Sequence, residues 1–203
     1  MPSHFLRIAL VLGLLSAIGP FAIDMYLPAL PSIGSTLNAS ASAVQASLMA
    51  FFISLGLGQM VYGPASDMLG RKKPMYFGLL IFAVGSVGCA MAPDIHTLVV
   101  WRFVQGLGAC AGMVVPRAVV RDLHTGEEAA RLMALLTLVF SVSPILAPLV
   151  GSFLIEWQGW RAVFWAVTVA AALAVLLMAT SMEETRAPEE RVDSTVQSAL
   201  SAY

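Results

Sequence analysis

Apolar residues form six long runs along the chain, and short polar breaks separate each run from the next. The breaks are rich in glycine and proline, which are typical of turns. A helix needs about 20 mostly apolar residues to cross the hydrocarbon core of a bilayer, and each run comes close to that length. The pattern predicts an all-α membrane protein with six transmembrane helices, which we expect at residues 6–27, 44–62, 75–91, 98–119, 132–154 and 163–181.

The two ends of the chain differ from these runs. The run that begins after Arg7 is too long for a secretory signal and lacks a clear A-x-A cleavage site, so we interpret it as a helix that stays in the protein. After residue 181, charged residues, proline, serine and alanine replace the apolar ones, and such a segment has too little apolar surface to fold alone. The sequence therefore predicts a transmembrane domain over residues 1–181 and a tail, or the start of a linker, over 182–203.

The composition narrows the class of protein further. Hydrophobic residues make up 59% of the chain, charged residues only 11%, and the mean hydropathy is +0.84, whereas soluble domains carry roughly 25% charge. A net charge of −1 argues against a nucleic-acid partner, because phosphate binding needs a basic surface. Cys89 and Cys110 both fall in apolar runs, so they are interpreted as buried thiols rather than a disulfide or a metal site. We expect no metal and no cofactor.

Basic residues fall almost entirely in alternate breaks of the pattern. Of the 11 Lys and Arg residues, nine lie on one side of the predicted membrane. Arg161 lies on the opposite side, and Arg102 lies within the membrane. Since positive charge marks the cytoplasmic side, both termini are predicted to be cytoplasmic. The basic residues on that side are Arg7, Arg71, Lys72, Lys73, Arg117, Arg121, Arg131, Arg186 and Arg191.

The break after the second run reads Gly-Pro-Ala-Ser-Asp-Met-Leu-Gly-Arg-Lys-Lys over residues 63–73. It resembles the loop between helices 2 and 3 of the major facilitator superfamily of secondary transporters, although Ala65 and Met68 replace a leucine and an arginine of that pattern. The resemblance implies a cytoplasmic gate that holds the outward-open state. The residues it assigns to the gate are Gly63, Asp67, Gly70, Arg71 and Lys72, with Arg121 and Asp122 as partners at the end of the fourth helix.

Three further motifs extend the resemblance over nearly the whole chain. The Arg-Phe-Val-Gln-Gly-Leu-Gly stretch over residues 102–108 is similar to the Arg-x-x-Gln-Gly-x-Gly element of helix 4. Pro148 and Gly151, preceded by Pro144, resemble the helix 5 element associated with antiporters. Its usual glycines are replaced by other small residues, which weakens the antiporter inference. Residues 24–31, together with the Arg-Ala-Val-Val-Arg-Asp stretch that follows helix 4, resemble the Bcr/CflA group of multidrug exporters.

Asp24 and Arg102 are charged residues within predicted transmembrane helices. A charge there costs about 3 kcal/mol on insertion scales, so it usually faces a cavity or finds a partner. Both lie roughly 6–8 Å inside the outer boundary, so they could meet if the first and fourth helices are neighbours. We expect Asp24 to bind a cationic substrate or exchange a proton, Arg102 to tune its pKa, and Tyr26 and Gln105 to line the same cavity. The alternative is that Asp24 anchors the helix end and Arg102 bonds backbone carbonyls.

These expectations converge on a secondary transporter rather than an enzyme, since the chain carries no GxSxG, HExxH or GxxxxGK[ST] motif. The resemblance implies the N-terminal half of a proton-coupled multidrug antiporter in the bacterial inner membrane, built of two inverted three-helix repeats. Its partners would be drug-like molecules, protons, the lipid bilayer, and either a missing C-terminal half or a second copy. The alternatives are a non-transporting half-length subunit and, less favoured, a nutrient/proton symporter.

Overall fold

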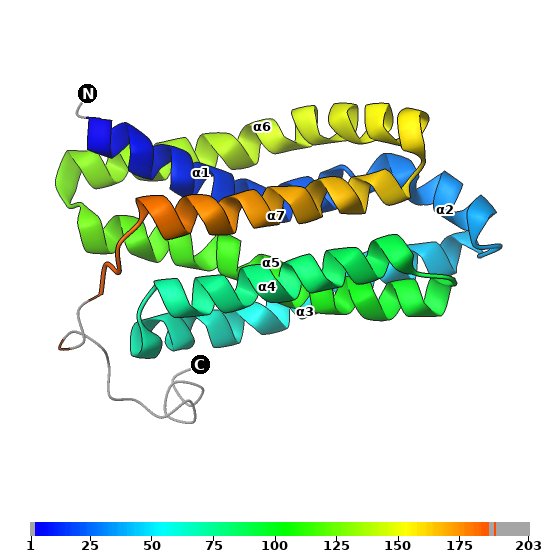
Figure 1. Ribbon diagram of the computed structural model, residues 1–203, viewed down its shortest axis with the longest axis horizontal. Coiled ribbons are helices and arrows are strands. Elements are labelled where there is room, and N and C mark those ends of the chain that lie inside the picture. Colours follow the sequence, from blue (N-terminus) through cyan, green and yellow to red (C-terminus); the bar gives the residue numbers. More distant parts are fainter. Residues whose placement is uncertain (1–2, 187–188, 190–203) are drawn as a thin grey trace.

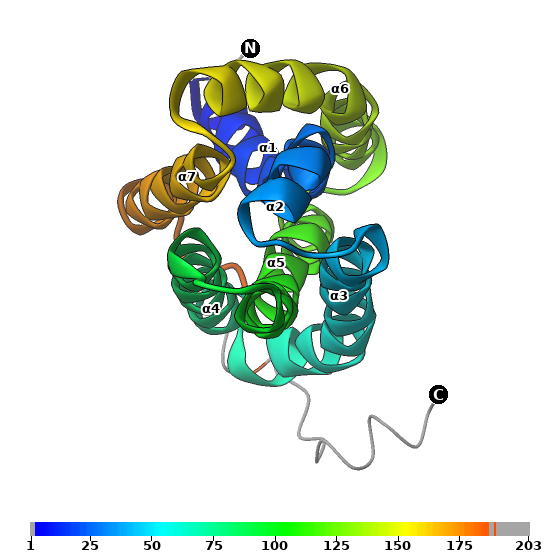
Figure 2. The ribbon, with the colours of Figure 1, turned by 90° about the vertical axis from the view of Figure 1, so that its right-hand side faces the viewer.

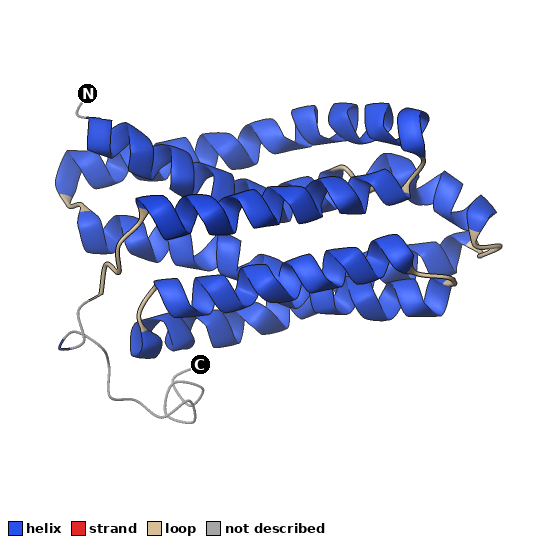
Figure 3. Ribbon diagram, viewed as in Figure 1, coloured by secondary structure: helices blue, strands red, loops and turns tan. Residues whose placement is uncertain are grey.

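The computed structural model describes residues 3–186 and 189, and in this part of the chain every regular element is a helix (Figure 3). Six helices are long and apolar enough to cross a membrane, which confirms the predicted class. The elements in chain order are α1 (Ser3–Asp24), the 3-10 helix η1 (Leu27–Ala29), α2 (Leu30–Thr36), α3 (Ala41–Leu69), α4 (Lys72–Met91), α5 (Ile95–Leu123), α6 (Gly126–Gln158) and α7 (Arg161–Ser181).

The long helices run side by side along the long axis of the molecule (Figure 1). One end of the bundle holds the start of α1, the α3–α4 and α5–α6 turns and the end of α7, and we call it the basic end. Seen along the axis, α5 lies between α1 and α3, α6 covers the far side of α1, and α4 packs against α5 and α7 (Figure 2). The first and fourth membrane helices, α1 and α5, are therefore neighbours.

The helices extend beyond most of the predicted boundaries. The second was expected to end at residue 62, but α3 runs through Pro64 to Leu69 and stops where Gly70 adopts a φ of 87°. Hydropathy detects only the apolar part of a helix, whereas the helix itself ends where the backbone turns or where a cap satisfies its free N–H groups. The first helix instead ends earlier than the predicted residue 27, because α1 stops at Asp24 and η1 follows after a short turn.

Small residues allow α5 to lie close to its neighbours. A Cβ atom on Gly106 would collide with Ser54 Oγ and the Phe51 carbonyl oxygen of α3, and one on Gly108 would collide with the α4 backbone at Phe82. Such close approach is typical of helix packing in membranes, where small residues let backbones touch. The Gln-Gly-Leu-Gly part of the helix 4 motif therefore has a packing role, and it positions the polar residues beside it.

Candidate functional site

Arg102 lies on α5 in the interior of the bundle, and its side chain has no exposed surface. Its Nη1 atom donates hydrogen bonds to Gln105 Oε1 at 2.6 Å and to the Ala22 carbonyl oxygen of α1 at 3.4 Å. Its guanidinium carbon lies 4.3 Å from the centre of the Tyr26 ring and 4.2 Å from that of the Phe51 ring. Aromatic faces attract a cation, most strongly where water is excluded, so the charge is held by two rings and an amide.

Polar side chains extend this arrangement to the neighbouring helices. Gln105 Nε2 donates to Ser86 Oγ on α4 at 2.8 Å, and Ser86 donates to the Phe82 carbonyl oxygen at 2.7 Å. On the other side of Arg102, the Tyr26 hydroxyl and Ser47 Oγ of α3 are 2.5 Å apart. All of these side chains are buried, so the network ties the interiors of α1, α3, α4 and α5 together.

Asp24 points to a different neighbour. Its carboxylate lies near the Ser143 hydroxyl of α6, although that hydroxyl makes no hydrogen bond of ordinary geometry. Over residues 3–186 and 189, Asp24 and Arg102 do not form an ion pair, so the meeting suggested by their equal depths is not seen. Arg102 instead bonds a backbone carbonyl, as the alternative interpretation proposed.

The structure also separates the four residues expected to line one cavity. Tyr26, Arg102 and Gln105 are completely buried, whereas Asp24 is partly exposed. Asp24 is therefore the member of this set that a substrate or a proton could reach directly in this conformation. The other three form an interior network behind it.

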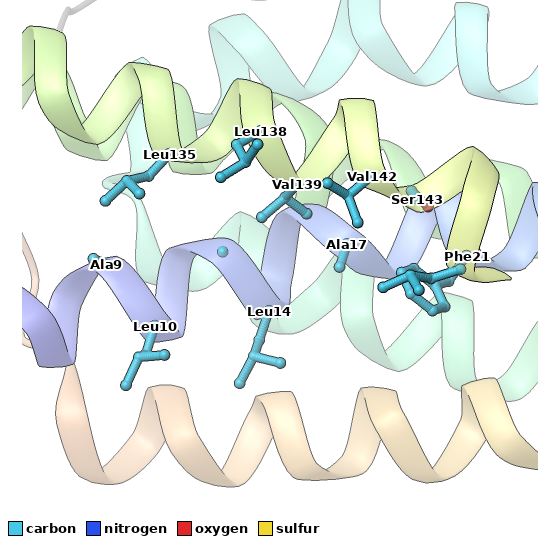
Figure 4. A pocket seen from close by; sticks show the side chains of 12 residues that line it. Ala9, Leu10, Leu14, Ala17, Phe21, Leu135, Leu138, Val139, Val142 and Ser143 are labelled. Carbon is cyan, nitrogen blue, oxygen red and sulfur yellow. The ribbon is translucent and has the colours of Figure 1, made fainter. Parts of the chain in front are cut away.

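An open groove of about 500 Å³ runs between α1 and α6 and ends close to Asp24. Its walls are apolar side chains such as Leu14, Leu138 and Val142, and Ser143 supplies the one polar side chain among its lining residues. Figure 4 shows Ser143 and Phe21 at the same end of the groove, and Asp24 follows Phe21 by about one helical turn. The groove thus has long apolar walls, and the Asp24 carboxylate lies next to Ser143 at one end, although Asp24 itself does not line the groove.

The helix 5 element packs against the end of α1. α6 continues through both Pro144 and Pro148, and it changes direction along its length (Figure 2). A Cβ atom on Gly151 would lie 2.6 Å from the Met25 carbonyl oxygen, so only glycine permits this approach without movement. Pro144, Pro148 and Gly151 therefore lie in the stretch of α6 that faces the Asp24 end of α1.

A second arginine, Arg71, forms the centre of a charged cluster at the basic end. Its Nε and Nη2 atoms donate to the Asp122 carboxylate of α5 at 2.6 and 3.1 Å. Its Nη1 donates to Asp67 Oδ1 at 2.8 Å and to Ser66 Oγ at 2.7 Å, both on α3. Burial lowers the pKa of Arg71, but the hydrogen bonds and charges of Asp122 and Asp67 outweigh it and raise the pKa above its ordinary value. The structure thus brings together three of the residues assigned to the gate.

The remaining gate residues surround this cluster. Gly63 faces open space in a polar hollow of about 310 Å³, which Arg121 also lines. The positive φ of Gly70 turns the chain so that α4 starts directly beside Arg71. Lys72 is directed away from the hollow, and its Nζ donates to the Met182 carbonyl oxygen at 2.7 Å. Arg121 is exposed and lies beside the cluster, whereas the next residue, Asp122, forms an ion pair with Arg71.

A family profile described as Major Facilitator Superfamily matches residues 12–202 of the chain. The chain belongs to this superfamily. It is 42% identical to the uncharacterized MFS-type transporter YdgK of Bacillus subtilis over 94% of the chain and 48% of that protein. It is 32% identical to the bicyclomycin resistance protein homolog of Haemophilus influenzae, over 90% of the chain and 46% of that protein. It is 33% identical to multidrug resistance protein D of Escherichia coli, over 92% of the chain and 48% of that protein.

These relatives confirm the resemblance to the Bcr/CflA group of transporters. Among solved structures, the proton:xylose symporter XylE superposes with a TM-score of 0.80 at 18% identity, over 98% of the chain and 49% of XylE. The human organic anion transporter MFSD10 superposes with a TM-score of 0.77 at 21% identity, over 96% of the chain and 51% of MFSD10. The fold is thus that of a major facilitator half, and the chain spans about half the length of the curated relatives it matches. It is a multi-pass membrane protein of a transporter family, not an enzyme.

Two residues of the charged cluster, Glu184 and Arg186, lie in the segment over residues 182–203 for which the sequence predicts a solvated tail. Glu184 and Arg186 both contact the cluster around Arg71, Glu184 through the backbone N–H of Arg71 and Arg186 through Asp67. The signal in the sequence is a change from apolar residues to a Glu-Glu-Thr-Arg stretch directly after α7. Such a change is also typical of any exposed linker, so it gave no reason to expect a folded contact.

Proposed function

We propose that this chain supplies one six-helix half of a proton-coupled exporter of drug-like molecules in a bacterial inner membrane, with its basic end in the cytoplasm. The observation that carries the proposal is the apolar groove between α1 and α6, which reaches Ser143, the neighbour of the partly exposed Asp24 carboxylate. Apolar walls with one charged group favour an amphipathic molecule, because the walls accept its rings or chains and the charge orients it. The names of the relatives, which refer to bicyclomycin, chloramphenicol and multidrug resistance, support the same substrate class.

Asp24 would couple substrate export to proton uptake. As a carboxylate it attracts a cationic substrate, and as a carboxylic acid it releases that substrate and carries a proton. An ionisable side chain inside a membrane that faces a cavity is by default a candidate for such exchange. The Arg102 network would hold the end of α1 in place behind Asp24, since Arg102 bonds the Ala22 carbonyl oxygen two residues earlier.

A second candidate is a half-length subunit that transports nothing without a partner. The exposed apolar surface of α3 and α6 supports it, because this surface must be covered by lipid, by a second six-helix half or by a second copy. It includes Met49, Phe52, Ile53, Leu57, Ile145, Leu149 and Phe153. A nutrient symporter stays the less favoured alternative.

The test uses the purified chain in proteoliposomes with an imposed pH gradient and the lipophilic cation tetraphenylphosphonium. We expect counterflow of protons and cation in the wild type, with a second copy of the chain supplying the other half, and loss of counterflow in Asp24→Asn. Asp94→Asn is the matched control, because it makes the same change at an exposed helix N-cap, where asparagine caps as well as aspartate. Equal counterflow in Asp24→Asn and wild type would refute the coupling role.

If the wild-type chain shows no counterflow, the same measurement is repeated with the second half of a relative such as multidrug resistance protein D in the vesicles. Counterflow only in the mixture would support the subunit that needs a partner. Absence of counterflow in both preparations, with the protein correctly inserted, would refute export.

A further inference from the structure

The groove between α1 and α6 continues into a second hollow on the other side of α1. This second hollow, of about 360 Å³, lies mainly between α1 and α7, and the two hollows share Leu14, Ala17 and Phe21. Figure 4 shows Leu14 projecting from α1 toward α7, while Leu138 lies on α6. Together the hollows form one open trough, with α1 as its floor and α6 and α7 as its walls (Figure 2).

The trough is about as deep as one leaflet of a bilayer. Its lining on α1 runs from Leu10 to Phe21, and its lining on α6 runs from Leu135 to Leu146. Each stretch covers eleven steps of 1.5 Å, or about 16 Å, and half of a hydrocarbon core of about 30 Å is about 15 Å. The floor is not covered by other helices, since Leu10 is 59% exposed and Leu14 is 50% exposed. A lipid acyl chain that lies in the trough would cover both leucines.

Both α1 and α6 carry an arginine one turn closer to the basic end. Arg7 precedes Leu10 and Leu14 by three and seven positions, so all three lie on one face of α1. Arg131 precedes Leu135 by four positions and therefore continues the lining face of α6. Long basic side chains near a helix end extend to the membrane surface, which is where a phospholipid carries its phosphate. The trough thus has a basic mouth and an apolar interior.

The partners of these arginines leave room for a phosphate. Arg7 Nη2 donates to the Thr180 carbonyl oxygen at 2.9 Å, which is a neutral acceptor. Arg131 pairs with Glu127 at 2.7 Å, but the two side chains are 61% and 79% exposed, so solvent screens the pair and another anion can replace it at small cost. Glu183 lines the same polar hollow as Arg7, and it is also exposed.

We propose that the trough binds an anionic phospholipid from the leaflet at the basic end, with one acyl chain along α1 and the phosphate held by Arg7 and Arg131. The apolar walls accept the chain, and the two guanidinium groups attract the charged headgroup. This inference goes beyond the proposed function, because the lipid stays in place and is not transported. A substrate that enters the groove would have to displace the chain.

The experiment is photolabelling of the full chain in phosphatidylcholine nanodiscs that contain a small fraction of phosphatidylglycerol with a diazirine in the middle of one acyl chain. The labelled positions are mapped by mass spectrometry. We expect labels on residues 10–21 and 135–146 to exceed those on residues 77–88 of α4 at least fivefold. The α4 stretch has the same length and includes Phe77, Leu80 and Val84, which are exposed. Equal labelling of the three stretches would mean ordinary lipid contact and would overturn the site.

The headgroup is tested with the same diazirine chain on phosphatidylcholine, and with two arginine variants. Each guanidinium should contribute about fivefold, so Arg7→Gln and Arg131→Gln should each lower trough labelling by that factor, and the phosphatidylcholine probe by at least as much. Lys73→Gln is the matched control, because it removes the same charge at an exposed position of the same end, on α4. Its labelling should stay within about twofold of wild type. Equal losses in all three variants, or equal labelling by both probes, would overturn the role of the arginines.

The chain site is tested by filling the trough. A Cβ atom on Gly13 has only Val139 within 4 Å, at 3.7 Å, so Gly13→Leu fits the helix and places its side chain among the lining residues. We expect this variant to lose trough labelling, whereas Gly56→Leu, which has open space on α3, should keep it. Unchanged labelling in Gly13→Leu would contradict the site.

Two controls complete the measurement. The buried thiols Cys89 and Cys110 must stay unreactive to maleimide in each variant, which shows that the bundle is intact. If a variant unfolds, the label map of the wild type decides by itself. No substrate and no pH gradient is used, so failure of the lipid site and failure of the proposed function are distinguishable.

Discussion

Arg71 offers the sharpest test of the charged cluster, since its side chain is only 4% exposed and donates to two carboxylates and a hydroxyl. Hydrogen bonds between charged groups contribute about 1.5–3 kcal/mol each. The bond to Asp67 must be discounted, because that carboxylate is 44% exposed and solvent screens it. The Asp122 carboxylate, at 19% exposed, accepts two bonds and contributes most. We therefore expect Arg71→Gln to destabilise the fold by about 3 kcal/mol.

Arg71→Lys should cost less but still be measurable. An ammonium keeps the charge, yet a single nitrogen cannot reproduce the fork that spans Asp122 and Asp67. We expect a loss of about 1–2 kcal/mol. Lys73→Gln is the control, because it removes a positive charge two positions after Arg71 in the chain. Lys73 is exposed, and a substitution at an exposed position changes the free energy of unfolding by no more than about 0.5 kcal/mol.

Two buried thiols provide the assay. Cys89 and Cys110 are both 0% exposed, so a thiol-reactive fluorophore labels them only when the bundle opens. Unfolding of membrane proteins in detergent is commonly irreversible, so midpoints are compared at one heating rate. At 2–4 °C per kcal/mol for a chain of this size, Arg71→Gln should lower the midpoint by about 6–12 °C. Equal midpoints for Arg71→Gln and Lys73→Gln would refute the reasoning.

Three further predictions follow from the packing and the electrostatics. Gly106→Ala should lower the labelling midpoint by several degrees, because its Cβ collides with the α3 backbone, whereas Gly56→Ala, which has open space, should not. Arg102→Gln should lower the free energy of unfolding by about 3 kcal/mol, because Arg102 is completely buried. Arg117→Gln on the same helix should lower it by less than about 0.5 kcal/mol, because Arg117 is exposed. Burial raises the pKa of Glu184, but backbone N–H bonds outweigh it and lower the pKa below its ordinary value of 4.5. The midpoint difference between wild type and Glu184→Gln should therefore persist from pH 8 to about pH 5 and vanish as acid protonates the folded carboxylate.

Much of the fold could be predicted because hydropathy is a local property. Each apolar run of sufficient length became one membrane helix, and the polar break over residues 63–73 did contain a turn, at Gly70. The ends of the helices could not be predicted in the same way, because Pro64 lies inside α3 and costs one hydrogen bond without stopping the helix. Where a helix ends depends on the turn that follows it, and hydropathy does not report turns.

The candidate site was less predictable, for a geometric reason. Depth along a helix follows from counting residues, and it placed Asp24 and Arg102 at similar levels. Direction decides contact, and α1 ends at Asp24, so the turn that follows can point Tyr26 to a different side of the helix axis. Tyr26 faces Arg102, whereas Asp24 faces α6 at Ser143. The bond from Arg71 to Glu184 joins positions 113 residues apart, so no local pattern could reveal it.

The two buried arginines are stabilised by different kinds of partner, and the difference indicates which region can move. Arg102 is held by aromatic rings, an amide and a carbonyl oxygen, all buried where water cannot replace them. Arg71 is held by carboxylates that are partly exposed, so water or another charged group can take over each partner at modest cost. We therefore expect the ends of α3, α4 and α5 to separate at the cluster around Arg71, while the part of α5 around Arg102 moves with α1 as one body. Spin labels placed across each region would distinguish the two, since only the pair that spans the basic end should show two distances.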